Sequence, residues 1–340
     1  MKRANELGAG YCFRLGIIAC LLLSAAGLPA QADESPQALL QRMINAVRST
    51  NYVGVCIYRF GDSLQAIRIV HQVKDGQRHE RLTSLTGPAR EIIRNDAQAT
   101  YIGPREHAAG KTLHLLDTPL GRTFSGSSAQ PIASNDRYDD YDLELNGTGR
   151  IAGRTAQRLN IVPHDNFRYG YRLWIDEQNG LLLRSDLVDE SGKPLEQIMF
   201  TTIKTPETIP DQWLQPTLTG DEIKWQRRPV SSAAVAASGP VWEVGNLPEG
   251  FKLTLQERHH LTGGRSGLVE HQLYSDGLAS VSVYIREEGK HPFNGWSRTG
   301  AVSAFGRTLD GYQIIVVGEV PPVTVQLIGE SVRRKADAGP

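Results

Sequence analysis

Residues 141–204 consist of strand-like segments joined by short turn sequences, and this arrangement constrains the fold more than any other feature. The segments are rich in β-branched and aromatic residues and occupy 141–145, 150–162, 169–176, 181–189 and 194–204. The separators include Asn146-Gly147 and Gln178-Asn179-Gly180. Parallel strands need a crossover of about a dozen residues or more, so these consecutive strands must pair antiparallel. One side of such a meander is apolar, and the sheet is expected to curl around helices or a cavity.

The residues before this meander predict one helix and a further set of strands. Ser35 followed by Pro36 is typical of a helix start, and apolar residues recur at helical spacing as far as Val47. Period-two patterns then predict strands at 52–60, 67–73, 78–85, 89–94 and 98–102. Residues 103–140 are irregular and predict long loops with a short helix near 131–140.

A proline-rich stretch separates this region from a smaller second unit. Prolines punctuate 205–230, and residues 231–240 have the composition of a linker. Strands are predicted beyond it at 251–259, 268–275, 278–286 and 312–320, followed by a helix from Pro321 to Val332. The predicted organisation is a leader at 1–32, a large domain at 33–215, a linker at 216–240, a small domain at 241–332 and a tail at 333–340.

The first 32 residues have the features of a secretory signal peptide. A basic region with Lys2, Arg3 and Arg14 precedes a short apolar run, and Ala30-Gln31-Ala32 matches a small-x-small cleavage site. We therefore expect cleavage between Ala32 and Asp33 and location in the periplasm. An uncleaved anchor is disfavoured, because about ten apolar residues are fewer than the ~20 that span a bilayer. A lipoprotein signal at Cys20 is disfavoured too, because the most apolar stretch follows the cysteine instead of preceding it.

Charge and cysteine content limit the classes of partner and the sources of stability. The 37 basic and 37 acidic residues balance, which argues against a nucleic-acid-binding surface. Cleavage would leave a slightly acidic chain in which Cys56 is the sole cysteine, so no intrachain disulfide could form. Cys56 lies between Val55 and Ile57 in a strand pattern, which predicts a buried, unreactive thiol.

The sequence contains no arrangement of residues that predicts catalysis or a cofactor. Neither a G-x-S-x-G elbow nor an H-E-x-x-H motif occurs, and adjacent His259 and His260 would point to opposite faces of a strand. Acidic residues concentrate between Asp136 and Glu144, around Tyr138 and Tyr141, without the spacing of a calcium loop. We therefore expect a non-enzyme without metal or cofactor, in which this acidic group faces solvent.

Several short fragments, in this order and spacing, resemble the MucB/RseB family over nearly all of residues 35–332. In the first domain they are Asn51-Tyr52-Val53-Gly54, the run from Arg168 to Asp176, and Gly180-Leu181-Leu182-Leu183-Arg184. In the second they are Leu247-Pro248-Glu249-Gly250-Phe251, the run from Tyr274 to Ala279 followed by Val281 to Ile285, and Val317-Gly318-Glu319-Val320-Pro321.

The resemblance implies an α+β protein with a large antiparallel half-barrel wrapped on helices, of the lipoprotein-carrier type, and a smaller α+β domain. It implies a periplasmic regulator that binds the periplasmic segment of a membrane anti-sigma factor and protects it from regulated proteolysis. Lipid or lipopolysaccharide would release this hold on the envelope-stress sigma factor.

Two groups of residues are expected to serve this function, and the oligomeric state is left open, with a homo-oligomer as one alternative. The residues predicted to contact the partner are Arg227, Arg228, Trp242, Phe251, Tyr274 and Tyr284. The residues predicted to line a lipid cavity are Leu39, Met43, Ile69, Leu173, Ile175 and Leu183.

A periplasmic lipid or lipoprotein carrier is the main competing hypothesis, because the first domain alone would look similar. A simple carrier needs only the half-barrel, whereas residues 241–332 supply a further interaction surface. A periplasmic hydrolase is a third alternative, disfavoured because no residue is placed as nucleophile or base.

Overall fold

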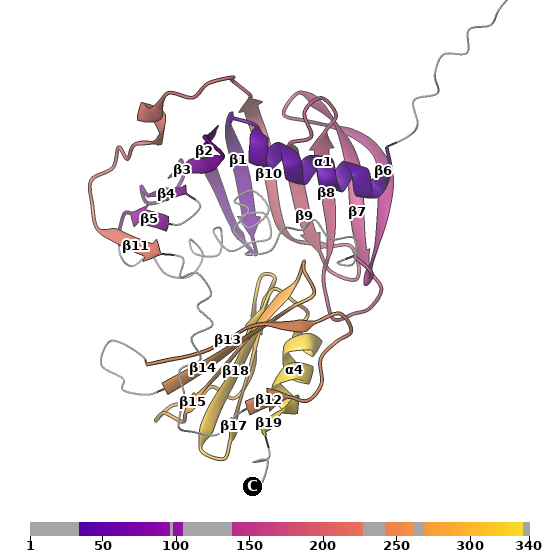
Figure 1. Ribbon diagram of the computed structural model, residues 1–340, viewed down its shortest axis with the longest axis vertical. Helices are drawn as coiled ribbons and strands as arrows, with labels where there is room; N and C mark the ends of the chain where they lie inside the picture. Colours follow the sequence, from indigo (N-terminus) through magenta and orange to yellow (C-terminus); the bar gives the residue numbers. More distant parts are fainter. Residues whose placement is uncertain (1–33, 96–97, 105–137, 227–241, 261–267, 336–340) are drawn as a thin grey trace, which may run out of the picture. The chain divides into compact units, whose positions relative to one another are not determined.

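The computed structural model describes residues 34–95, 98–104, 138–226, 242–260 and 268–335, and two sheets dominate these ranges (Figure 1). The two α-helices there are α1 (Pro36–Ser49) and α4 (Pro322–Ser331). The first five strands are β1 (Tyr52–Phe60), β2 (Ser63–Lys74), β3 (Gln77–Ser84), β4 (Glu91–Asn95) and β5 (Gln98–Ile102). The next six are β6 (Tyr141–Ile151), β7 (Arg154–Pro163), β8 (Gly170–Asp176), β9 (Leu182–Val188), β10 (Pro194–Lys204) and β11 (Glu222–Gln226). The remaining strands are β12 (Trp242–Val244), β13 (Lys252–His260), β14 (Leu268–Ser275), β15 (Ser280–Glu287), β16 (Gly295–Thr299), β17 (Val302–Leu309), β18 (Tyr312–Gly318) and β19 (Val332–Arg334).

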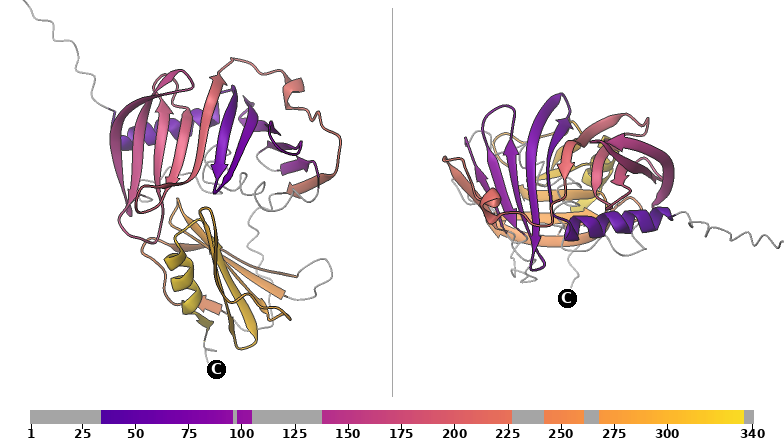
Figure 2. Two further views of the ribbon diagram at one scale, coloured as in Figure 1. Left: turned by 180° about the vertical axis from the view of Figure 1, so that it is seen from behind. Right: turned by 90° about the horizontal axis from the view of Figure 1, so that it is seen from above.

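The large domain, residues 35–226, is built on one open antiparallel sheet of eleven strands. The strand order is β11-β5-β4-β3-β2-β1-β10-β9-β8-β7-β6, so two meanders join where β1 pairs with β10. The sheet ends at β11 and β6 and curls without closing, as the view from above shows (Figure 2). This confirms the predicted antiparallel half-barrel.

Helix α1 begins where the sequence predicts and lies against β6 and β7. The Ser35 side chain caps it by accepting a hydrogen bond from the Ala38 amide at 3.2 Å. One face buries Leu39, Leu40, Met43 and Ile44, and burial of each such side chain contributes about 1.5–3 kcal/mol.

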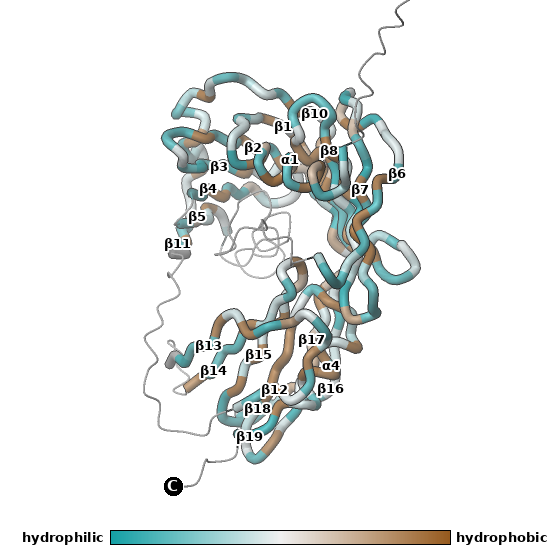
Figure 3. The backbone as a smooth tube through the Cα atoms, turned by 45° about the vertical axis from the view of Figure 1, so that its right-hand side comes forward, coloured by the Kyte–Doolittle hydropathy of each residue, from teal (hydrophilic) through white to brown (hydrophobic). Residues whose placement is uncertain are grey.

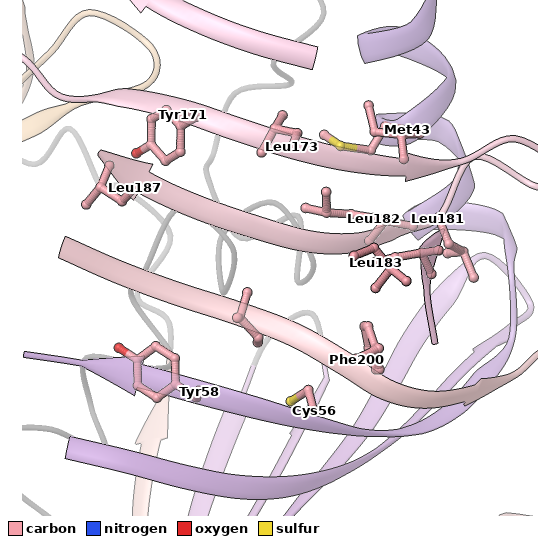
Figure 4. Packing of buried hydrophobic residues seen from close by; sticks show 14 of the residues in the cluster. Met43, Cys56, Tyr58, Tyr171, Leu173, Leu181, Leu182, Leu183, Leu187 and Phe200 are labelled. Atoms are coloured by element: carbon pink, nitrogen blue, oxygen red, sulfur yellow. The ribbon is translucent and has the colours of Figure 1, made fainter. Parts of the chain in front are cut away.

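The core of the large domain combines α1 with residues that alternate along the strands. In Figure 4 the buried Met43 lies near Leu173, and the buried Cys56 lies near Phe200. Cys56 is a free, fully buried thiol, and burial raises its pKa to about 12, so the predicted unreactive character is consistent with its environment.

The small domain, residues 242–335, has a six-stranded antiparallel sheet in the order β13-β14-β15-β18-β17-β16. Helix α4 packs against β17 and β18, and β12 pairs with β19 beside it. Hydrophobic and hydrophilic stretches alternate along the strands of both sheets in Figure 3, as expected for sheets with one buried face. The domain therefore has a separate core, which includes Val283, Val316 and Ile328.

Three local predictions differ from the structure. Asn146-Gly147 does not end a strand: β6 continues through it with a bulge between Leu145 and Thr148, and the hairpin turn lies at Ala152-Gly153. Both of these turn residues have positive φ (49° and 80°), as a tight two-residue hairpin requires. Strand β11 falls within the range predicted as linker and pairs with β5, while β16 and β17 were not predicted. Most of the short helix predicted near 131–140 lies outside the described residues.

Candidate functional site

The strongest candidate site is a buried arginine that joins the two domains. Arg168 lies in the loop between β7 and β8, and its side chain has no solvent exposure. Its guanidinium contacts carboxylates of Asp140 (3.1 Å), Asp165 (2.9 Å) and Asp276 (2.8 Å) and donates to the Glu249 carbonyl (2.6 Å). Charge-assisted hydrogen bonds of this kind are about twice as strong as neutral ones.

The partners of Arg168 come from both domains. Asp140 precedes β6 and Asp165 belongs to the same loop as Arg168, so both are in the large domain. Asp276 lies in the turn between β14 and β15, and Glu249 precedes β13, so both are in the small domain. The contact therefore assembles four segments that are far apart in the sequence.

Two aromatic rings enclose the guanidinium. Arg168 lies 5.4 Å from the ring centre of Tyr141 and 5.2 Å from that of Phe251, within the range of cation–π contacts. The Tyr141 hydroxyl donates to Asp276 Oδ2 at 2.8 Å. We call Arg168, Asp140, Asp165, Asp276, Tyr141, Phe251 and the Glu249 carbonyl the Arg168 cluster.

Burial dominates the electrostatics of the Arg168 cluster. It raises the pKa of Asp276 above its usual value, although Tyr141, two backbone amides and Arg168 each favour the charged carboxylate. Burial and the Asp276 charge likewise raise the pKa of Tyr141, so its hydroxyl remains a donor. For Arg168, burial acts against the charge, but hydrogen bonding to Asp165 and the nearby Tyr141 and Asp276 raise its pKa overall. The guanidinium therefore stays charged. Removing Arg168 would leave the buried Asp276 carboxylate without its cation.

The prediction that the acidic group at 136–144 faces solvent is wrong for one member. Asp142 and Glu144 are exposed, and Asp142 pairs with exposed His164. Asp140 instead contacts Arg168, and adjacent Tyr141 is buried. Asp136 lies outside the described residues. Sequence reasoning missed Arg168, because nothing in the local pattern shows that a loop arginine faces a turn more than a hundred residues away.

Other contacts also join the two domains. The Thr324 hydroxyl on α4 donates to the Phe167 carbonyl at 2.6 Å. Ala301, in the turn between β16 and β17, is fully buried and belongs to the large-domain core. At Gly300, a Cβ would lie only 2.9 Å from the Phe60 ring, so the glycine permits this close approach.

The six residues predicted to line a lipid cavity belong to one hydrophobic core cluster. All are buried in the core of the large domain: Leu39, Met43, Ile69, Leu173, Ile175 and Leu183. A separate pocket of about 360 Å³ lies between strands β2–β5 and the segment 211–216. Gln72, His79 and Thr100 contribute to its lining, and none of the six predicted residues does.

The residues predicted to contact a partner are placed differently from one another. Trp242, Phe251 and Tyr274 are buried in the small-domain core, and Phe251 also contacts Arg168. Tyr284 is partly exposed and stacks on His271 with ring centres 4.4 Å apart. Arg227 and Arg228 lie outside the described residues.

A second charged cluster, built on the buried Glu80, lies within the large sheet. Arg94 donates a hydrogen bond to Glu80, and Glu80 Oε1 lies 2.7 Å from His71 Nδ1. The His71 ring stacks on Tyr52. Burial alone would raise the pKa of Glu80, but Arg94 and His71 outweigh it and lower the pKa to about 2. We call Tyr52, His71, Glu80 and Arg94 the Glu80 cluster.

The described residues contain no group of three or more potential metal ligands, and no described helix is long and apolar enough to cross a membrane.

Two family models match the chain along almost its whole length. The MucB/RseB N-terminal domain matches residues 35–218, and the MucB/RseB C-terminal domain matches residues 236–333. The chain belongs to the MucB/RseB family. The resemblance seen in the sequence is thereby confirmed, and the Arg168 cluster joins the two domains that define the family.

Members of the family from other bacteria show the same full-length correspondence. The sigma factor AlgU regulatory protein MucB of Pseudomonas aeruginosa is 32% identical over 332 residues, covering 94% of this chain and 97% of that protein. The sigma-E factor regulatory protein RseB of Haemophilus influenzae is 30% identical over 322 residues, covering 92% and 95%.

Solved structures of MucB share the fold of both domains. MucB in complex with MucA(peri) has a TM-score of 0.68 and 27% identity, covering 89% of this chain and all of that chain. The MucA/MucB complex of Pseudomonas aeruginosa has a TM-score of 0.69 and 28% identity, covering 88% and 99%.

Proposed function

We propose that this protein binds the periplasmic segment of a membrane-spanning anti-sigma factor and protects it from regulated proteolysis. It would thereby restrain an envelope-stress sigma factor, without catalysing a reaction. The observation that carries the proposal is the correspondence of both domains with MucB, a protein solved in complex with MucA(peri). A simple lipid carrier would not require the second domain.

We place the protein in the periplasm. The support is the leader sequence, whose basic region, apolar run and Ala30-Gln31-Ala32 site are typical of a cleaved signal peptide. N-terminal sequencing of the protein recovered from a periplasmic extract should begin at Asp33. An intact leader in the mature protein would contradict this placement.

Partner contacts are proposed on the small domain, and Tyr284 is the first residue to test. It alternates along β15 with buried Val283 and Ile285, so its ring lies on the opposite face of the sheet. Tyr284→Ala should weaken binding of the anti-sigma segment by ten-fold or more, because partly exposed tyrosines are frequent binding hot spots worth roughly 2 kcal/mol. Trp296→Ala on β16, where the side chain is 67% exposed, is the matched aromatic control and should leave affinity unchanged. Equal effects of both variants would contradict the assignment.

Release by lipid is proposed to act through the large-domain core. The six residues predicted to line the cavity are already packed together, so entry of an acyl chain would rearrange this core. A ligand changes partner affinity only through its different affinities for the two conformations. A spin-labelled fatty acid should be immobilised by residues 33–340 and displaced by excess unlabelled fatty acid, whereas free tumbling at saturating protein would exclude this site.

A reconstituted protection assay tests the proposal as a whole. Residues 33–340 are mixed with the periplasmic segment of the cognate anti-sigma factor and the stress protease, with and without lipopolysaccharide. We expect slow cleavage with this protein and faster cleavage once lipopolysaccharide is added. Equal cleavage rates with and without this protein would exclude the regulator function, and protection that lipopolysaccharide does not relieve would exclude lipid release alone.

A further inference from the structure

The hydrogen-bonding partners of Arg168 are divided between the domains in a way that opposes gradual separation. Asp140 and Asp165 would remain beside Arg168 if the small domain moved away. Asp276, the Glu249 carbonyl and the Phe251 ring would leave together, because all three belong to the small domain.

Asp276 is the group most affected by such a movement. Its side chain has no solvent exposure, and Oδ1 accepts hydrogen bonds from the amides of Leu278 and Ala279. Oδ2 accepts from Arg168 and Tyr141, which both belong to the large domain. Unless water reached Oδ2, separation would leave half of a buried carboxylate without compensation.

Two further contacts between the domains would be lost in the same movement. These are the Thr324–Phe167 hydrogen bond and the burial of Ala301 in the large-domain core. Hydrogen bonds weaken steeply once distance or angle departs from the ideal. A rotation that shifts the small domain by a few ångströms would therefore break the interdomain hydrogen bonds together. The described residues from Ser35 onward accordingly form one compact unit.

We propose that the Arg168 cluster is a two-state interdomain latch, with Arg168 as its positioning residue. The small domain is held in one orientation on the large domain, and it reorients only when the whole cluster opens. While the cluster is closed, a long segment between the domains is not sufficient to give them a continuous range of orientations. A ligand that prefers one orientation would then shift an equilibrium between two states.

This inference concerns the protein without a partner. The latch can therefore be absent in a protein that binds the anti-sigma segment, and it can be present in a protein that does not. It is tested by measuring the distance between spin labels in the two domains by pulsed electron paramagnetic resonance. In residues 33–340 Cys56 is the sole cysteine, and Cys56→Ala removes it. Cysteines introduced at Leu85 and Trp296, which are 48% and 67% exposed, carry the labels.

The parent should give one narrow distance distribution. Arg168→Met should add a second, well-populated distance, because loss of a buried ionic partner changes such an equilibrium roughly 100-fold or more. A single distribution identical to that of the parent, in a variant with native circular dichroism, would overturn the latch. A continuous broad distribution would also overturn it, because it shows many orientations and not two.

Arg154→Met is the matched control. Arg154 pairs with buried Asp176 at 2.5 Å within the large domain, so its loss removes a similar ion pair without affecting the small domain. The distance distribution should stay that of the parent, and a second distance in this variant would show that general destabilisation is sufficient.

A milder variant keeps the test decisive if Arg168→Met does not fold. Tyr141→Phe combined with Thr324→Val removes two interdomain hydrogen bonds and no charge. The same second distance should appear at a smaller population. Its absence, together with an unchanged rate of proteolysis between the domains, would overturn the proposal.

Discussion

The Arg168 cluster and the Glu80 cluster use the same chemistry in two different structural settings. In each, an arginine meets a buried carboxylate beside aromatic rings. The Glu80 cluster follows the register of adjacent strands, where Tyr52 pairs with His71, His71 with Glu80, and Glu80 with Arg94. The Arg168 cluster joins loops and turns of two domains.

The difference shows that one type of interaction can stabilise a sheet or couple two domains. Neighbouring strands already hold the Glu80 cluster in place, so its loss should weaken the large domain only. Among the described residues no strand pairing joins the two domains at the Arg168 cluster, so its loss should also change how the domains unfold relative to each other.

Removing Arg168 should have the largest effect. Arg168→Met leaves Asp276 buried without its cation and should lower the free energy of unfolding by about 3–5 kcal/mol. Calorimetry should show two transitions in place of one, because the domains no longer unfold together. Arg154→Met should lower the melting temperature while keeping one transition, and two transitions in that control would contradict the comparison.

Acid should have the second-largest effect, through the Glu80 cluster. The pKa of Glu80 is lowered from 4.5 to about 2 in the folded protein, so its stabilisation is complete above pH 4.5 and is lost as the pH falls toward 2. That shift corresponds to roughly 3 kcal/mol. Glu80→Gln should therefore be much less stable than the parent at pH 7, and the difference should shrink as the pH falls toward 2. Urea unfolding at pH 7, 4.5 and 3 measures this, and a difference that does not change with pH would show that Glu80 is not ionised in the fold.

Gly250→Ala should have an intermediate effect. Gly250 has φ of 79°, and a Cβ there would lie 1.8 Å from Asp140 Oδ2, so alanine both strains the backbone and displaces a member of the Arg168 cluster. We expect a loss of about 2–3 kcal/mol. Gly311→Ala is the control, since its φ is 76° with nothing near the added methyl, and it should cost about 1 kcal/mol. Equal losses at the two positions by chemical denaturation would mean that Asp140 moves aside freely.

Tyr141→Phe should have the smallest effect. It removes the hydrogen bond to Asp276 and keeps the ring beside Arg168, for a loss of about 1 kcal/mol. Tyr274→Phe removes a hydroxyl that donates to Gln272 at 2.7 Å inside the small domain. Both variants should lose similar stability, but only Tyr141→Phe should increase proteolysis between the domains. Identical proteolysis patterns would contradict an interdomain role for the Tyr141 hydroxyl.

Much of the fold could be predicted because it depends on local patterns. Ser35 and Pro36 begin α1, and short turns require the antiparallel order of β6–β10. The pairing of β1 with β10 could not be predicted in this way, because the two strands belong to different meanders and lie about 140 residues apart in the sequence. Strands β16 and β17 were also missed: every residue of β16 is exposed, so no apolar alternation marks that strand.

The candidate site, like the fold, could be predicted only in part from the sequence. Sequence alone determined the two-domain order, the buried character of Cys56 and the apolar residues of the large-domain core, because composition and periodicity report on burial within one element. Arg168 and Asp276 lie in loops with ordinary composition, and only docking of the domains decides that they meet. Tertiary structure therefore decided which charges are buried together, because an ion pair between distant segments depends on geometry that no local pattern records.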